Sequence, residues 1–149
     1  MHPEVYSRRA MTRVASMNWA EMKAPSLDDL EDLARTSFGE LPAEFRNLAA
    51  GIAFVVQDFP DEDTLKDFDV ESEFDLLGLF HGADLAARRA NRGAPEPTII
   101  VLYRRPILDY WAEHDDPLGA IMRHVLVHEI GHHFGLSDEA MHAIEARQE

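Results

Sequence analysis

Apolar residues recur with a helical period in four parts of the chain and form short continuous runs in three others. The helical period predicts amphipathic helices, whereas short runs rich in β-branched and aromatic residues predict buried strands. The predicted helices cover 26–38, 42–51, a long segment that begins at Pro117, and 137–148. The predicted strands cover 52–57, 76–80 and 98–103.

Capping residues, glycines and prolines set the predicted boundaries of these elements. Ser26 begins the first helix and Gly39 ends it. Pro106 breaks the third strand, after which 107–111 can form one helical turn. Pro117 is expected at the first position of the long helix, behind two aspartates that form a suitable cap. The order of elements predicts an α+β fold in which a small sheet packs on the long helix.

The remaining segments are predicted to form loops between these elements and an extension at the N-terminus. The acidic stretch 58–75 does not have the spacing of an EF-hand calcium loop, so we expect a solvated loop with a short helical turn. The segment 83–93 fits an exposed turn or short helix, and Gly93, Pro95 and Pro97 mark a loop. Residues 1–25 predict a poorly ordered N-terminal extension, and 26–149 predict a single domain.

Composition narrows the possible partners and metal ligands. The formal charge is −14, which argues against a surface for nucleic acid or for an anionic membrane. The chain has no secretory h-region and no run of about 18 apolar residues, so we expect a cytoplasmic protein. Because cysteine is absent, a metal would have to be held by nitrogen and oxygen ligands.

A candidate metal site lies in the long helix. His128 and His132 are four residues apart and so lie on the same helical face, with Glu129 beside the first. The apolar residues upstream on this face predict that the helix buries it, and buried polar groups require partners. The pattern H-E-x-x-H is typical of a zinc site with a glutamate as general base.

The motif continues with Gly135 and Asp138, which gives H-E-x-x-H-x-x-G-x-x-D. This resembles the long zinc signature of the metzincin-like clan of metallopeptidases, whose third ligand is usually His and in a minority of members Asp. The glycine would end the helix in a left-handed conformation and turn the chain back toward the metal. The resemblance implies that His128, His132 and Asp138 bind Zn²⁺.

The third ligand has alternatives. Asp138 also fits a first-turn acid that is favoured by the dipole of a helix capped by Ser137. In that case the metal could take its third ligand from Glu139, His142 or Glu145 on the same final helix, as in zincins whose third ligand is a Glu on a second helix. His and carboxylate ligands also suit divalent metals other than zinc.

Looser patterns extend the resemblance to about residues 26–146. The segments ELPAEFR, GLFHG and TIIVLYRRPI precede HEIGHHFGLSDE. Together they resemble the small bacterial zincin-like, or minimal, metallopeptidase family. The resemblance implies the upper half of a zincin, with the lower subdomain nearly absent after the zinc signature.

The function implied is hydrolysis of a peptide or protein substrate. In this mechanism metal-activated water attacks the peptide bond and Glu129 acts as the general base. One of the strands TIIVLY and LLGLF could form a rim along which an extended peptide adds. The oxyanion would need a further donor, for which the candidates are Tyr103, Tyr110, His133 and His142.

A zinc-stabilised binding or regulatory module without turnover is the alternative. The missing lower subdomain would leave a shallow site with little substrate-binding energy. A fourth metal ligand from Glu139, His142 or Glu145 would favour this alternative, and an open position would favour the enzyme. Two further residues have simple structural interpretations: His81 is expected in a loop, and Met141 is expected in the core.

Overall fold

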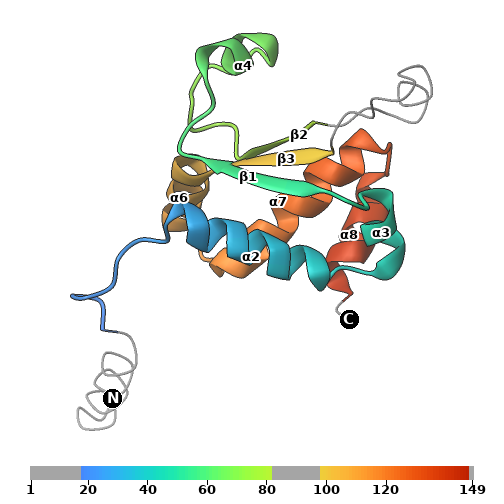
Figure 1. Ribbon diagram of the computed structural model, residues 1–149, viewed down its shortest axis with the longest axis horizontal. Coiled ribbons are helices and arrows are strands. Elements are labelled where there is room, and N and C mark those ends of the chain that lie inside the picture. The colour runs from blue at the N-terminus through green and yellow to red at the C-terminus, as the bar shows by residue number, and fades with distance from the viewer. Residues whose placement is uncertain (1–17, 82–97, 148–149) are drawn as a thin grey trace, which may run out of the picture.

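The computed structural model describes residues 18–81 and 98–147. Within these ranges the chain forms six helices and three short strands. Figure 1 shows their arrangement. In chain order the elements are α2 (Leu27–Gly39), α3 (Ala43–Leu48), β1 (Ala53–Gln57), α4 (Glu62–Asp67), β2 (Gly78–His81), β3 (Ile99–Tyr103), α6 (Arg104–Glu113), α7 (Leu118–His133) and α8 (Asp138–Ala146).

The three strands form one mixed sheet in the order β1-β3-β2. β3 is central: it pairs in parallel with β1 and antiparallel with β2. The segment TIIVLY therefore cannot be the rim of the sheet, because its strand is hydrogen-bonded on both sides. LLGLF contributes β2, which has the outer edge that a further strand would need.

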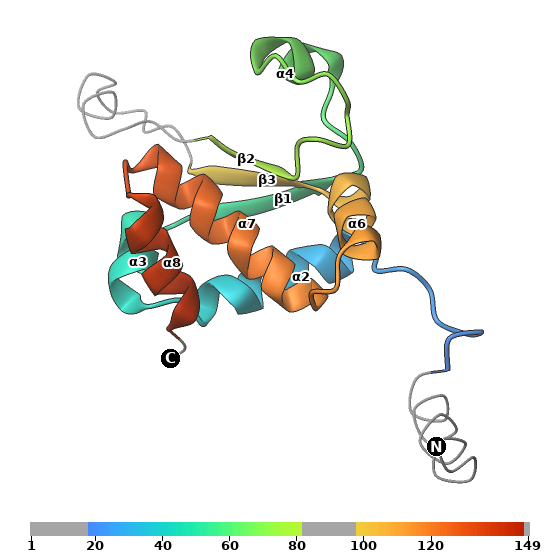
Figure 2. The same ribbon diagram turned by 180° about the vertical axis from the view of Figure 1, so that it is seen from behind.

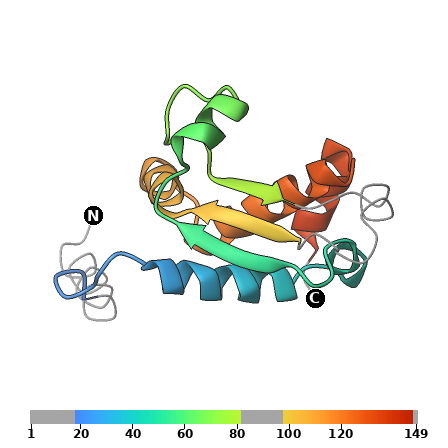
Figure 3. The same ribbon diagram turned by 45° about the horizontal axis from the view of Figure 1, so that its top comes forward.

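Helices α2 and α7 cover one face of the sheet. Figure 3 shows α2 running below the strands, and Figure 2, the view from behind, shows α7 crossing in front of them. The side chains on this face belong to the buried core: Phe54 from β1, Phe80 from β2, and Ile100 and Leu102 from β3. Burying apolar side chains between two layers is the main stabilising contribution to such a fold. The predicted α+β architecture is confirmed.

The helix boundaries follow the predicted caps closely. Ser26 accepts a hydrogen bond from the Asp29 backbone amide, and the Asp29 carboxylate accepts one from the Ser26 amide. This reciprocal capping box satisfies two amides that the first turn leaves unpaired. Pro117 precedes α7 as its N-cap residue and is not its first helical residue, so that prediction is wrong by one position.

The helix α6 is longer than the predicted single turn at 107–111. It starts at Arg104, directly after β3, and includes Pro106 as its third residue. The first-turn amides of a helix have no intrahelical partner, so a proline there removes no hydrogen bond. The prediction that Pro106 breaks the third strand is therefore wrong, because β3 ends at Tyr103 and Pro106 lies within α6.

The strand β2 is shorter than the predicted run 76–80, because it begins at Gly78 and extends to His81. A side chain on Gly78 would meet the Val125 side chain of α7 at 3.0 Å and the Val101 carbonyl of β3 at 3.2 Å. The glycine thus allows the edge strand to approach the helix that carries the histidines.

Some predictions fall outside the described residues, namely those for most of the N-terminal extension and for 83–97. The acidic stretch 58–75 contains the six-residue helix α4, which agrees with the predicted short helical turn. In the described ranges, no helix combines the length and apolar character that crossing a bilayer requires.

The turn between α7 and α8 directs the last helix back along α7. Gly135 has a positive φ of 75°, and the amides of Gly135 and Leu136 donate to the carbonyls of His132 and Gly131. These paired bonds form a Schellman motif, as the predicted glycine stop requires. The Ser137 hydroxyl then accepts from the Ala140 amide and caps α8.

Close packing at Gly131 sets the approach of α8 to α7. Met141 of α8 is fully buried, which confirms the expected core role. A Cβ on residue 131 would lie 2.6 Å from the Met141 sulfur and 2.9 Å from its Cγ. Side chains larger than hydrogen at position 131 would therefore push the two helices apart.

We expect Gly131→Ala to destabilise the protein by about 1–3 kcal/mol through this overpacking. Gly119 on the same helix is the matched control, because a Cβ there would meet nothing within 4 Å among the described residues. Gly119→Ala should stabilise the protein by about 0.5–1 kcal/mol through helix propensity. Urea unfolding of both variants measures the difference, and equal effects of the two changes would contradict the packing.

Candidate metal centre

Helix α7 presents three histidines in a line, one turn apart. His124, His128 and His132 follow at intervals of four residues. The ring centroids of His124 and His128 are 3.9 Å apart, and those of His128 and His132 are 5.6 Å apart. The spacing of the helix therefore places the three imidazoles on one side, where they face the final helix α8.

His128 is the central and most enclosed of the three. Its side chain is 19% exposed, and its Nε2 atom is buried with no hydrogen-bond partner in the described part of the chain. Burial lowers the pKa of His128, and the neighbouring His124 lowers it further. The ring is therefore neutral at neutral pH, and neutral imidazole is the form that binds a metal.

Glu129 is partly buried beside His128. Loss of solvation raises the pKa of its carboxyl group above the ordinary value, and the His132 charge opposes this only in part. A carboxylate with a raised pKa is a better proton acceptor once it is ionised. The position has the electrostatic character expected of a general base.

His132 and Asp138 lie at the open end of the row. Their side chains are 60% and 85% exposed, and His132 Nε2 lies 3.9 Å from Asp138 Oδ1. The prediction that the histidine face is buried is therefore wrong at His132, which lies in the last turn of α7. Asp138 is at the same time the first residue of a capped helix, so both interpretations of this acid fit the geometry.

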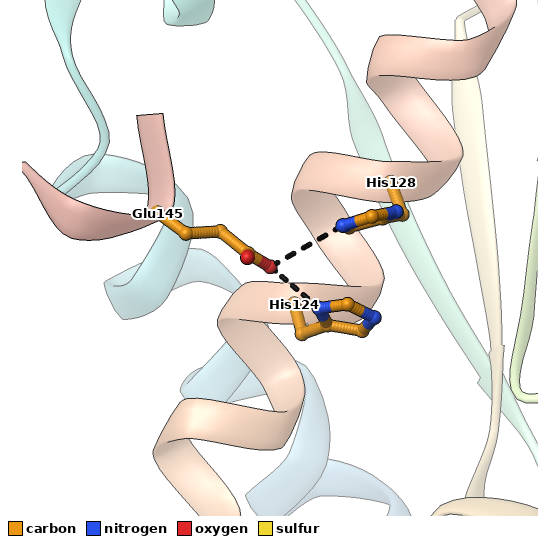
Figure 4. Close-up of side chains that lie close together, drawn as sticks. All are labelled: His124, His128 and Glu145. Carbon is orange, nitrogen blue, oxygen red and sulfur yellow. Dashed lines mark hydrogen bonds and ion pairs between the residues drawn. The ribbon is translucent and has the colours of Figure 1, made fainter. Parts of the chain in front are cut away.

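Glu145 reaches His128 and His124 from the last turn of α8, as Figure 4 shows. Its Oε1 atom lies 3.6 Å from His128 Nε2 and 2.6 Å from His124 Nδ1. Glu145 is one of the alternative third ligands predicted from the sequence, whereas His124 lies outside the predicted set. The signal for His124 was its position four residues before His128, on the same helical face.

Arg123 holds the end of α8 that carries Glu145. Its guanidinium donates to the backbone carbonyls of Ile144, Glu145 and Arg147. The last carbonyls of a helix have no intrahelical partner, so a cation there both satisfies them and complements the helix dipole. These bonds tie the end of α8 to α7 beside Glu145.

A pocket of about 650 Å³ opens beside these residues. His124, His128, Glu129 and Glu145 line it together with Tyr110. Its volume falls within the ordinary range for a binding site. The pocket therefore gives a ligand access to both His128 and the candidate base.

Of the four oxyanion-donor candidates, Tyr110 has the most suitable place. Tyr103 is buried, and loss of solvation raises the pKa of its phenol. His133 packs its ring on Phe80 at 4.3 Å. The ring centroid of His142 is 6.2 Å from that of His128. Tyr110 alone among them lines the described pocket.

Two other residues from the sequence do not contribute to the centre as it stands. His81 is exposed at the end of β2 and does not line the pocket. Glu139 is an exposed residue in the first turn of α8. The cluster of metal-binding type in the described ranges consists of His124, His128 and Glu145, so His81 and Glu139 lie outside it, as do the predicted ligands His132 and Asp138.

The donor set fits a divalent metal. His128 supplies a buried nitrogen without a hydrogen-bond partner among the described residues, and α8 supplies a carboxylate at each end of the row. Imidazole nitrogen and carboxylate oxygen are ordinary zinc ligands. A metal would also relieve the cost of leaving a buried polar atom unpaired.

In metal-free protein we expect Glu129→Gln to raise the melting temperature at pH 7. The raised pKa means that the folded state prefers the neutral carboxyl, so stability is lost as the pH rises through the folded pKa. Glutamine does not titrate and avoids this loss. Thermal melts with a chelator should show the gain at pH 7 and its disappearance below the ordinary Glu value of 4.5. A gain that does not change with pH would contradict the assignment.

The chain was compared with curated proteins and with models of protein families. No curated protein matches the chain. A family model described as zincin-like metallopeptidase matches residues 49–148, which is more than half of the chain. The match covers all three strands, the histidine helix and α8. The chain therefore belongs to the zincin-like metallopeptidase family.

Proposed function

We propose that the protein is a zinc-dependent peptidase in which His128, His132 and Asp138 hold the metal and Glu129 is the general base. The observation that carries the proposal is the buried Nε2 atom of His128, which has no hydrogen-bond partner among the described residues, beside a carboxylate whose pKa is raised by burial. Family membership supports the reaction class.

Bound zinc would supply a Lewis acid that lowers the pKa of water and polarises the substrate carbonyl. Glu129 would accept the proton of the attacking water and return it to the leaving amine. Burial of Glu129 supports this assignment, because it raises the carboxylate's affinity for that proton. Tyr110 would donate a hydrogen bond to the developing oxyanion.

The proposed substrate is a peptide in extended conformation. The edge strand β2 is hydrogen-bonded to β3 on one side only in the described sheet. Leu76 and Leu77, which lead into β2, line the same pocket as His128. A peptide that adds to this edge would be held by main-chain hydrogen bonds beside the metal centre.

One observation favours the alternative of a zinc-binding module without turnover. Glu145 lies close enough to His128 to reach a metal bound there. If Glu145 occupied the fourth coordination position, no position would remain for water. The presence of Glu129 favours the enzyme, because a structural zinc has no need of a base.

We expect Glu129→Gln to reduce hydrolysis of a peptide library at least 100-fold while zinc content stays near the wild-type value. Glutamine keeps the size of the side chain and removes only the proton acceptor. Glu139→Gln is the matched control, since it removes one exposed carboxylate from α8 and should leave hydrolysis unchanged.

Retained zinc with unchanged hydrolysis in Glu129→Gln would contradict the role of this residue. Zinc binding without hydrolysis of any library peptide by the wild type would instead support the binding module.

Tyr110→Phe should lower kcat about 10–100-fold and leave KM nearly unchanged, because an oxyanion donor acts chiefly in the transition state. Steady-state kinetics on the best library peptide measures both constants. An unchanged kcat, or a loss that lies entirely in KM, would contradict the role.

A further inference from the structure

Two of the three carboxylates of α8 face different parts of the histidine row. Asp138 in the first turn lies near His132, and Glu145 in the last turn lies near His124 and His128. His128 stands between them. The proposed catalytic ligands use only one end of this arrangement, which leaves His124 and Glu145 without a role.

His124, His128 and Glu145 have the composition and spacing of a metal site. One ligand atom from each residue lies within 4.8 Å of the other two, and this is the cluster of metal-binding type that the described residues contain. In a tetrahedral zinc site, ligand bonds of about 2.0–2.2 Å place the ligand atoms roughly 3.2–3.6 Å apart. The distance of 3.6 Å from His128 Nε2 to Glu145 Oε1 already fits.

The closer pair needs only a small adjustment. His124 Nδ1 and Glu145 Oε1 are 2.6 Å apart, the distance of a hydrogen bond between the two side chains. A cation would replace the shared proton and widen this pair by less than about 1 Å, to the ligand spacing of a tetrahedral site. His124 is 54% exposed, so its ring has room to move.

The backbone supporting this cluster is held in place. His124 and His128 lie one turn apart on the long helix α7, and Arg123 fixes the carbonyl end of α8 next to Glu145. The cluster also lines the 650 Å³ pocket, so a cation can enter it from solvent. Because α7 and α8 hold the backbone of these ligands in place, binding a metal costs less conformational entropy.

We propose that His124, His128 and Glu145 form a second divalent-cation site that competes with His132 and Asp138 for His128. Because the Nε2 atom of His128 can bind one metal at a time, occupation of the second site withdraws this ligand from the first. The inference goes beyond the peptidase assignment and does not require it, since it concerns metal binding alone.

The test uses the full chain with the first site removed, as His132→Ala with Asp138→Asn. We expect this double variant to bind one Co²⁺ or Zn²⁺ per chain, followed by cobalt absorption and by competition with a chelating dye. Adding His124→Ala or Glu145→Gln should weaken binding at least tenfold. Adding Glu139→Gln, the matched control on α8, should not change it.

Each result decides the matter. Loss of metal binding in the double variant would overturn the second site, as would unchanged affinity after both His124→Ala and Glu145→Gln. Glu145→Gln preserves the backbone carbonyl that Arg123 binds, so its fold is expected to persist; circular dichroism melts verify this. This test measures metal binding and not hydrolysis. Failure of the peptidase proposal would instead be seen in the hydrolysis measurements on Glu129→Gln.

Discussion

The close contact between α7 and α8 is the constraint on which the candidate centre depends. Met141 fills the space above Gly131, and the Schellman turn at Gly135 sets the direction in which α8 leaves. Together they bring two carboxylates of α8 to a row of histidines on α7. The packing is apolar and the centre is polar, so the core determines the geometry of the ligands without sharing their chemistry.

The centre carries an electrostatic cost in metal-free protein. Burial opposes charge on both His128 and Glu129, and the Nε2 atom of His128 has no hydrogen-bond partner in the described ranges. Buried groups in this condition destabilise a fold unless a ligand compensates them. A divalent cation would compensate the histidine, and a protic substrate or water would compensate the glutamate. Buried ionisable groups that reduce stability in this way are typical of catalytic and metal-binding sites.

Much of this could be predicted from the sequence, because local chemistry decides it. The capping residues Ser26 and Ser137 and the stop at Gly135 act through hydrogen bonds a few residues away. The long helix, the three strands and the family resemblance follow from such patterns. Pro106 shows the limit: whether a proline breaks an element depends on where the helix starts, and tertiary contacts decide that.

The contacts between α7 and α8 could not be predicted from local sequence patterns. The position of His124 on the face of His128 was readable, but its partner Glu145 is 21 residues away and reaches it only because of the angle between α7 and α8. The exposure of His132 depends on the same angle. Sequence patterns identified His128 and His132 of the row, and only the packing shows which carboxylate faces which histidine.

The most direct test of the account is the zinc content of the purified protein beside His128→Ala and His81→Ala. His128 is the ligand common to both proposed sets, whereas His81 lies outside the pocket. The account predicts near-stoichiometric zinc in the wild type and in His81→Ala, and less than about a tenth of it in His128→Ala. Zinc retained by His128→Ala, or no zinc bound by the wild type even after the metal is added, would contradict the account.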